Sequence, residues 1–307
     1  MKAKSHLLEA FMNKKDEFYT RYEDIEKEVR HYKEFFKGKT VYCNCDNPKY
    51  SNFIKFFKNN FKEYGLSRLI ATFKSENPCF YEYDGVNEKT QPISDGDFAS
   101  PECVEFLKQC DIVVTNPPFS LFRKFFDMLI NNNKEFLVIG NLLACGYKQV
   151  FPHIKSGKVN IGYSFHNSST FEIPKSYSNN KGAFEKDGKF YATVPARWFT
   201  TFPVANYIMP LTLTEDYSPD KYPQYENFDA INVDKTRKIP KDYYGVMGVP
   251  LSFIDFWNKD QFELLGLACR WSDMRTKVYH SCKDDLNAGG VINGKGKFQR
   301  MLIKRKV

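Results

Sequence analysis

Apolar and polar positions follow two different periods along the first 140 residues. Short apolar runs rich in β-branched and aromatic residues are typical of buried strands, whereas apolar residues every three or four positions are typical of helices. The short runs predict strands at 41–45, 69–73, 79–83, 111–115 and 136–139. The runs 69–73 and 79–83 are close enough to form a hairpin, or a strand and its excursion. The helical spacing predicts a helix or a helix pair over 14–36, and helices over 50–64, 101–109 and 120–131. This alternation favours an α/β fold with a parallel, doubly wound sheet.

The pattern weakens after about residue 140. Strands are expected again at 158–163 and 198–202, and the polar, turn-rich residues 174–190 predict an exposed loop or hairpin. The last fifteen residues, 293–307, hold several cations and no acid around the apolar Met301-Leu302-Ile303, which predicts a final strand. We expect two regions, 1–205 and 206–307.

Composition and charge narrow the class of protein. A chain of 307 residues with 42% hydrophobic content can bury a full core and is not disordered. The net charge of +8 favours a polyanionic partner, nucleic acid being the simplest, although a surplus of this size also serves solubility. There is no apolar run of about 18 residues and no signal-peptide core, so we expect neither membrane insertion nor secretion but a cytoplasmic protein.

The cysteines and histidines do not predict a metal site. The eight cysteines include no C-x-x-C, and the five histidines do not stand at ligand spacing beside them. An even number of cysteines does not imply disulfides in a chain of this size without a secretory signal.

The stretch Asn116-Pro117-Pro118-Phe119 follows the predicted strand 111–115 and carries the candidate chemistry. Two prolines end the strand, because neither can donate to a sheet ladder, so Asn116 lies at a strand's carboxyl end. Ligands bind at that edge of open α/β sheets. The stretch resembles the catalytic motif of methyltransferases that use S-adenosylmethionine to alkylate a planar, conjugated amino group. A strand followed by a turn without chemistry is the alternative.

The motif suits transfer to the exocyclic nitrogen of adenine, whose lone pair is delocalised into the ring. Acceptors on its two N–H bonds, the Asn116 side-chain oxygen and the Pro117 carbonyl, favour a pyramidal and more nucleophilic amine. Pro118 and Phe119 are the candidate contacts of an extruded base, with Phe119 as a stacking face. Transfer is then a direct, in-line displacement that needs neither a metal nor a covalent enzyme intermediate.

The whole chain resembles the EcoRI-type adenine-specific DNA methyltransferases. The likeness is carried by Asp16 to Thr20, Val41 to Phe53, Gly96 to Phe98, Asn116 to Phe119, Ala196 to Thr200 and Met247 to Pro250. It implies a Rossmann-like methyltransferase sheet in a catalytic domain (1–205), S-adenosylmethionine as cofactor, and adenine N6 in double-stranded DNA as acceptor. Residues 206–307 are then the DNA-recognition region, and a cognate restriction endonuclease is a possible genetic partner.

The resemblance also implies cofactor-binding residues. Asp46 and Asn47 follow the first strand at the cofactor's methionine end, in a turn that lacks the glycines of most methyltransferases, as in the EcoRI-type proteins; Asp46 could also cap the helix over 50–64. Asp97 and Phe98 are assigned to the cofactor's adenine, or form a simple turn. Asp84 is a candidate for the ribose hydroxyls, or an Asp-Gly turn. The remaining candidates are Asp16, Tyr19 and Thr20 of the N-terminal motif, where Arg21 replaces a common proline, and Asn116.

Two further groups are candidates for contact with DNA. Arg197 and Trp198 either meet the DNA strand or the flipped base, or are a surface arginine and a core tryptophan. Lys304, Arg305 and Lys306 either bind phosphates or form a solvated basic tail.

Two rival functions remain open on the sequence. Methyltransferases with Asn-Pro-Pro-aromatic motifs also modify RNA bases and protein glutamine amides, whose nitrogens pose the same electronic problem. A nucleic-acid-binding module with a decayed cofactor pocket is the non-catalytic alternative, against which the intact motif at 116–119 counts.

Overall fold

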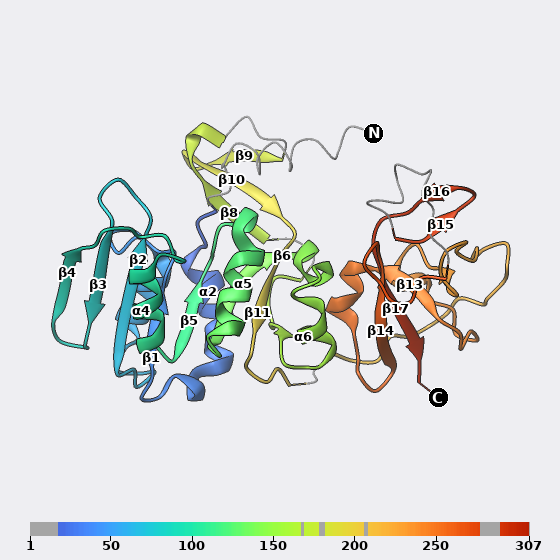
Figure 1. Ribbon diagram of the computed structural model, residues 1–307, viewed down its shortest axis with the longest axis horizontal. Helices are drawn as coiled ribbons and strands as arrows, with labels where there is room; N and C mark the ends of the chain where they lie inside the picture. The colour runs from blue at the N-terminus through green and yellow to red at the C-terminus, as the bar shows by residue number, and fades with distance from the viewer. Residues whose placement is uncertain (1–17, 167–168, 178–181, 206–207, 277–288, 307) are drawn as a thin grey trace. The chain divides into compact units, whose positions relative to one another are not determined.

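A computed structural model describes residues 18–166, 169–177, 182–205, 208–276 and 289–306. The chain forms two compact units (Figure 1). The first comprises Met1–Asn141 with Val159–Val204, and the second comprises Leu142–Lys158 with Ala205–Val307. Each unit is described by itself.

The first unit is built on an eight-stranded sheet in the order β4-β3-β2-β1-β5-β6-β11-β7. Its centre is parallel: β1 (Thr40–Cys43) pairs with β2 (Arg68–Phe73) and β5 (Ile112–Thr115), and β5 pairs with β6 (Glu135–Asn141). The predicted parallel sheet is confirmed for these four strands.

Antiparallel strands extend the sheet on both sides. β3 (Cys79–Tyr83) and β4 (Glu88–Pro92) continue it beyond β2, and β11 (Ala196–Thr200) and β7 (Asn160–Ile161) beyond β6. The sequence did not predict β4, because this strand is mostly exposed and has no apolar alternation. The parallel sheet was therefore wrong at its edges, whereas the hairpin left open for 69–73 and 79–83 is confirmed as β2 and β3.

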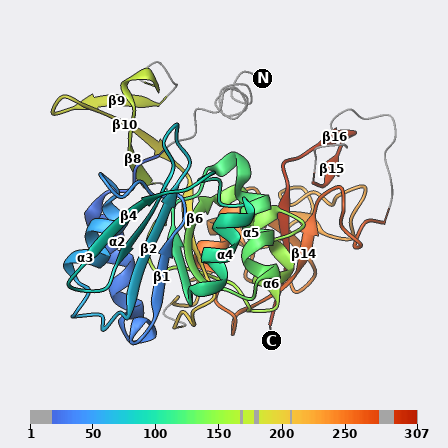
Figure 2. The same cartoon turned by 60° about the vertical axis from the view of Figure 1, so that its left-hand side comes forward.

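Helices cover both faces of the sheet (Figures 1 and 2). α2 (Tyr22–Val29), the 3-10 helix η1 (Arg30–Phe36) and α3 (Asn52–Asn59) contribute aromatic and aliphatic side chains to the core on one face. α4 (Pro101–Gln109) and α5 (Phe122–Asn131) cover the other, where the rings of Phe122 and Phe126 pack on Phe199 and Phe136. The fold is thus a three-layer α/β/α arrangement.

A small three-stranded sheet also belongs to the first unit, in the order β8-β10-β9. β9 (Ala183–Lys186) and β10 (Lys189–Val194) are the hairpin expected near 174–190, and β8 (Ser169–Ile173) was not predicted. Tyr19 pairs with Glu172 of β8 through backbone hydrogen bonds of 2.9 and 3.2 Å. Residues 18–20 are therefore extended, and the helix predicted over 14–36 was wrong there, its first four residues lying outside the described ones.

The second unit holds a four-stranded sheet in the order β12-β13-β17-β14. The strands are β12 (Ile231–Asn232), β13 (Met247–Pro250), β14 (Phe262–Ala268) and β17 (Arg300–Arg305), with the short pair β15 (Val291–Ile292) and β16 (Lys295–Gly296) beside them. The predicted final strand is confirmed as β17.

The segment 142–158 belongs to this second unit, not to the region 1–205 in which the sequence placed it. It contains the 3-10 helix η3 (Leu142–Gly146) and α6 (Phe151–Lys155). Gln299 Nε2 donates to the Gly146 carbonyl at 2.8 Å, and Lys155 Nζ donates to the Leu265 carbonyl. Contacts between residues this far apart along the chain leave no trace in the local pattern of the sequence.

The remaining short 3-10 helices are η2 (Phe119–Leu121), η4 (Lys175–Tyr177), η5 (Thr236–Lys238) and η6 (Leu251–Phe256). Within the described residues, no helix is long and apolar enough to cross a membrane, and no cluster of potential metal ligands occurs.

Candidate active site

Polar side chains gather at one edge of the central sheet in the first unit. β1, β2 and β5 run parallel, so their carboxyl ends meet at this edge. The turns after β1 and β5 bring Asp46 and Asn116 there, and Thr115 at the end of β5 donates to Asp46 at 2.5 Å. Residues 18–20 run across the same edge, because Asn116 donates to them.

Asn116 is held so that its side-chain oxygen has a fixed direction. Its Nδ2 donates to the Phe18 carbonyl at 2.6 Å and to the Thr20 hydroxyl at 3.3 Å. If the amide were flipped, its oxygen would face the Phe18 carbonyl oxygen, and two acceptors cannot form a hydrogen bond with each other. Asn116 Oδ1 is buried and has no partner among the described residues. A buried acceptor without a partner is costly, so the donor of a bound ligand would be favoured at this oxygen.

Phe119 lies directly beyond the two prolines and is almost fully buried, with 5% exposure. Its ring stacks on Phe18, with centroids 5.3 Å apart and 26° between the planes. A base that stacks on this face of Phe119 therefore has to displace the Phe18 ring. The role of Phe119 as a stacking face stays a prediction, as do those of Pro117 and Pro118.

Asp46 is buried at the end of the turn after β1. It accepts hydrogen bonds from the Ser51 hydroxyl at 2.6 Å and from Thr115. Burial raises the pKa of Asp46 to about 6, although both hydrogen bonds act in the opposite direction. The N-cap of α3 is Ser51, whose hydroxyl accepts from the Phe53 amide. The prediction that Asp46 caps this helix was therefore wrong, because Asp46 accepts a hydrogen bond from the capping residue instead.

Asn44, which the sequence reasoning missed, precedes this carboxylate by two residues. It is 1% exposed, and neither atom of its amide has a partner among the described residues. The sequence feature that could have identified Asn44 is a polar residue inside the apolar run 41–45. A carboxylate and an unsatisfied amide suit a ligand that carries both an ammonium and a carboxylate group. Asn47 instead closes its own turn, accepting from the Lys49 amide and donating to the Tyr50 hydroxyl.

Asp97 and Phe98 stand in the loop before α4, which lies beside the carboxyl end of β2. A Cβ on Gly96 would meet the Phe73 carbonyl oxygen at 2.0 Å, so only glycine lets this loop approach the strand so closely. Burial acts to raise the pKa of Asp97, but the ion pair with Lys74 at 2.7 Å and the bond from the Ala99 amide outweigh it and lower the pKa. Phe98 packs edge-on against Phe125. Both residues therefore lie at the carboxyl edge of the sheet, and their contact with the cofactor's adenine stays a prediction.

Asp84 does not belong to the site. β3 runs antiparallel to β2, with Tyr83 opposite Leu69 at the start of β2, so Asp84 lies toward the opposite edge of the sheet. Its carboxylate accepts from the Val86 and Asn87 amides in its own turn, and these backbone hydrogen bonds lower its pKa. The assignment to the ribose was wrong, because it assumed a parallel strand.

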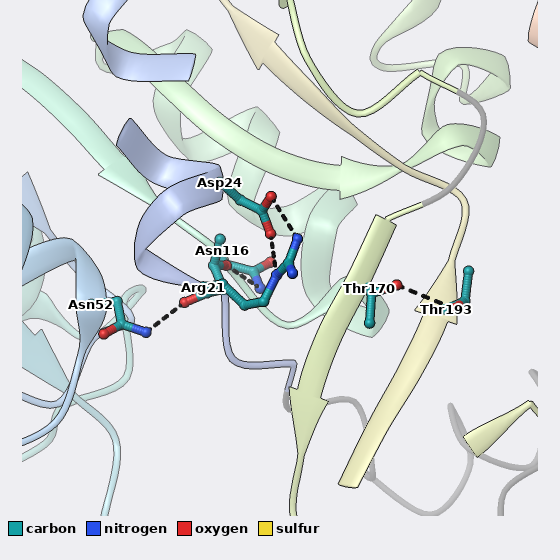
Figure 3. A network of polar contacts seen from close by, with 7 residues as sticks. Arg21, Asp24, Asn52, Asn116, Thr170 and Thr193 are labelled. Atoms are coloured by element: carbon teal, nitrogen blue, oxygen red, sulfur yellow. Dashed lines mark hydrogen bonds and ion pairs between the residues drawn. The ribbon is translucent and has the colours of Figure 1, made fainter. Parts of the chain in front are cut away.

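The candidate residues of the N-terminal motif lie in different environments. Asp16 lies outside the described residues. Tyr19 is 38% exposed and pairs with β8 through its backbone. Thr20 is buried; its carbonyl accepts from Asn52 Nδ2 at 2.9 Å (Figure 3), and its hydroxyl faces Asn116. The cofactor roles of Tyr19 and Thr20 stay predictions, but the Thr20 hydroxyl already accepts a hydrogen bond from Asn116.

Arg197 and Trp198 are both fully buried, with 0% exposure. Trp198 packs in the core, stacked on Phe165 with centroids 5.6 Å apart. Arg197 Nη1 donates to the Ala196 carbonyl. The prediction that they contact DNA is not supported, and the surface arginine of the alternative was also wrong, because every residue of β11 is buried.

The three C-terminal cations lie in the second unit. Lys304 and Lys306 are exposed, as phosphate contacts require. Arg305 is engaged within the protein, donating to the Lys241 carbonyl and lying 4.8 Å from the centre of the Tyr244 ring.

Comparison with known proteins bears on the whole chain. The family model described as adenine-specific methyltransferase EcoRI matches residues 6–94 and 82–306. The Type II methyltransferase M.EcoRI of Escherichia coli is 39% identical over 98% of this chain and 96% of its own. M.MgeORF184P of Mycoplasma genitalium is 37% identical over 98% and 99%, and M.MpnI of Mycoplasma pneumoniae is 36% identical over 95% and 96%. No solved structure matches the chain.

Proposed function

Because the chain belongs to the EcoRI family of adenine-specific methyltransferases, we propose that it transfers the methyl group of S-adenosylmethionine to N6 of adenine in double-stranded DNA. The family makes it an adenine-specific methyltransferase, and the Type II relatives make DNA its substrate. The cofactor, the duplex and the roles of single residues are the proposal. A cognate endonuclease is its expected genetic partner, and the cytoplasm its expected place of action.

The orientation of Asn116 carries the proposal. Its Nδ2 is committed to Phe18 and Thr20, and its buried Oδ1 has no partner among the described residues. That oxygen can accept one N–H of the target amine, and the Pro117 carbonyl can accept the other. Both acceptors draw the amine out of conjugation with the ring and present its lone pair.

The cofactor fits the residues at the same edge. S-adenosylmethionine supplies a methyl group bound to a positively charged sulfur. Asp46 would hold its ammonium and the Asn44 amide its carboxylate, while Asp97 would accept from the adenine amino group and Phe98 pack on that ring. The cofactor's methionine end would also lie near Asn47, Tyr19 and Thr20.

The target base has to leave the duplex, since its N6 is otherwise held in a base pair. Phe119 would receive it once the Phe18 ring moves aside. Lys304 and Lys306 would contact phosphates from the second unit, so the recognition region of the proposal starts at Ala205 and includes the segment Leu142–Lys158. The rival substrates, RNA bases and glutamine amides, present comparable amines, so the test has to separate them.

Methylation sequencing of DNA from cells that express the chain tests the proposal. N6-methyladenine should occur in one short sequence context, and cells with the Asn116→Ala variant should lack it. Methylation found only in RNA or on protein glutamine, with unmodified DNA, would overturn the proposal.

A further inference from the structure

One corner of the second unit presents an aromatic side chain to solvent among cations. We call residues 295–300 with Arg270 and Trp271 the Phe298 corner. Phe298 is 70% exposed and Trp271 is 39% exposed. The two segments are neighbours, because Arg300 pairs with Ala268 where β17 begins and β14 ends.

Single exposed apolar residues are ordinary on protein surfaces and need a further reason to be informative. Here the reason is a rigid backbone. The amide of Lys297 donates to the Gly290 carbonyl and its carbonyl accepts from Gly289, both at 2.8 Å. On the other side of Phe298, Gln299 is anchored to the Gly146 carbonyl. The ring is therefore presented on a fixed base and does not lie on a loose loop.

The charge around the ring points to a polyanion. Residues 289–306 contain six cations and no acid. Lys295 and Arg270 are exposed, and Lys297 is half-buried directly before Phe298. The cores of protein interfaces are depleted in lysine, whereas aromatic groups set among cations are typical of surfaces that grip nucleic acid by stacking and by phosphate contacts.

We propose that the Phe298 corner binds the DNA duplex, with Phe298 inserted against the bases and Lys297 on a neighbouring phosphate. The inference rests on the proposed function for its ligand, but it assigns a stacking contact to a unit for which the proposed function names phosphate contacts. Insertion of an apolar side chain unstacks a base step and makes the duplex easier to deform.

Fluorescence anisotropy with labelled short duplexes of randomised sequence, at several salt concentrations, tests the proposal on the full-length protein. Phe298→Ala should weaken binding about fivefold to hundredfold, since stacking on one base is worth ~1–3 kcal/mol. The salt slope should not change, because the charge of the protein is the same. Phe298→Trp, which keeps an aromatic face, should bind within about twofold of the wild type. Lys297→Gln should lower the salt slope by about 0.9.

Val86→Ala is the matched control, because Val86 is 83% exposed in a turn beside Asp84 and Glu88 and should not touch DNA. Unfolding temperature and cofactor titration check that each variant is folded. Wild-type affinity in Phe298→Ala, or equal weakening in the Ala and Trp variants, would overturn the proposal. Methylation by the wild type is measured in parallel: its absence would reject the proposed function, whereas an unchanged Phe298→Ala affinity rejects only this inference.

Discussion

The carboxyl edge of the central sheet and the surface of the second unit use polar residues in opposite ways. At the sheet edge, Asn116 donates hydrogen bonds to the Phe18 carbonyl and to the Thr20 hydroxyl. Asp46 accepts hydrogen bonds from Ser51 and Thr115, and both Asp46 and Thr20 are buried. On the second unit, Lys304 and Lys306 are exposed. Transfer to a weak nucleophile needs atoms fixed within tenths of an ångström, whereas grip on a polyanion needs charge that can adapt.

Among substitutions at these two regions, the largest effect on methyl transfer is expected at Asn116. Asn116→Ala should lower the single-turnover rate of methyl transfer by about a hundredfold or more, because the variant loses one of the two acceptors proposed for the target amine. Cofactor affinity in a calorimetric titration should remain near that of the wild type. Near-normal transfer in this variant would refute the role of the asparagine.

A smaller effect is expected at Thr20, which distinguishes positioning from cofactor binding. Thr20→Val removes one neutral hydrogen bond to Asn116 Nδ2, so kcat should fall about threefold to tenfold. KM for the cofactor should stay unchanged, and Thr20→Ser, which keeps the hydroxyl, should restore kcat. A raised KM with normal kcat would instead make Thr20 a cofactor contact.

Asp46 should make cofactor binding depend on pH. With its pKa raised to about 6 by burial, the carboxyl is ionised only above that pH, and only the ionised form attracts an ammonium. Cofactor affinity measured by calorimetry should fall by up to tenfold per pH unit below about 6. Asp46→Asn should bind weakly at every pH, and a wild-type affinity that is flat from pH 7 to 5 would exclude Asp46 as the ammonium partner.

The stability of the cofactor-free protein should change in the opposite direction. A carboxyl whose pKa is higher in the folded than in the unfolded state stabilises the fold below about pH 4, and this contribution disappears as the pH rises through about 6. The contribution is worth roughly 3 kcal/mol. Denaturant unfolding of the wild type and of Asp46→Asn at pH 5 and pH 7 should show this dependence only in the wild type.

The smallest effect belongs to the exposed cations. Neutralising Lys304 and Lys306 together should lower the log–log salt slope of DNA binding by about 0.9 for each phosphate that these lysines neutralise in the wild type. Sequence preference should hold, since phosphate contacts position the protein without reading bases. Arg305→Gln is the comparison: its guanidinium is engaged by Lys241 and Tyr244, so it should change stability more than slope. An unchanged slope in the double variant would assign these lysines to solvent.

The sequence predicted what is local. α4 begins at Pro101 as expected, because proline suits a first helical position and Ser100 caps the helix. The buried strand 112–115 and the turn at Asn116 were also readable, since an apolar run followed by two prolines has few other solutions.

Long-range pairing was not readable. Asp84 follows a strand as Asp46 does, but β3 is antiparallel, so the two carboxylates lie toward opposite edges of the sheet. Arg197 carries a charge that normally indicates the surface, yet its strand is covered on both faces. The contact between Phe18, Thr20 and Asn116 joins residues almost a hundred positions apart. It is this contact that orients the side-chain oxygen of Asn116.

A crystal structure of the protein with a duplex that contains its methylated sequence and a non-reactive cofactor analogue tests the central claim most directly. The account predicts a flipped adenine whose N6 lies about 2.7–3.1 Å from Asn116 Oδ1, while Nδ2 still donates to the Phe18 carbonyl. An adenine amine bonded to other acceptors, or an Asn116 amide turned the other way, would contradict it.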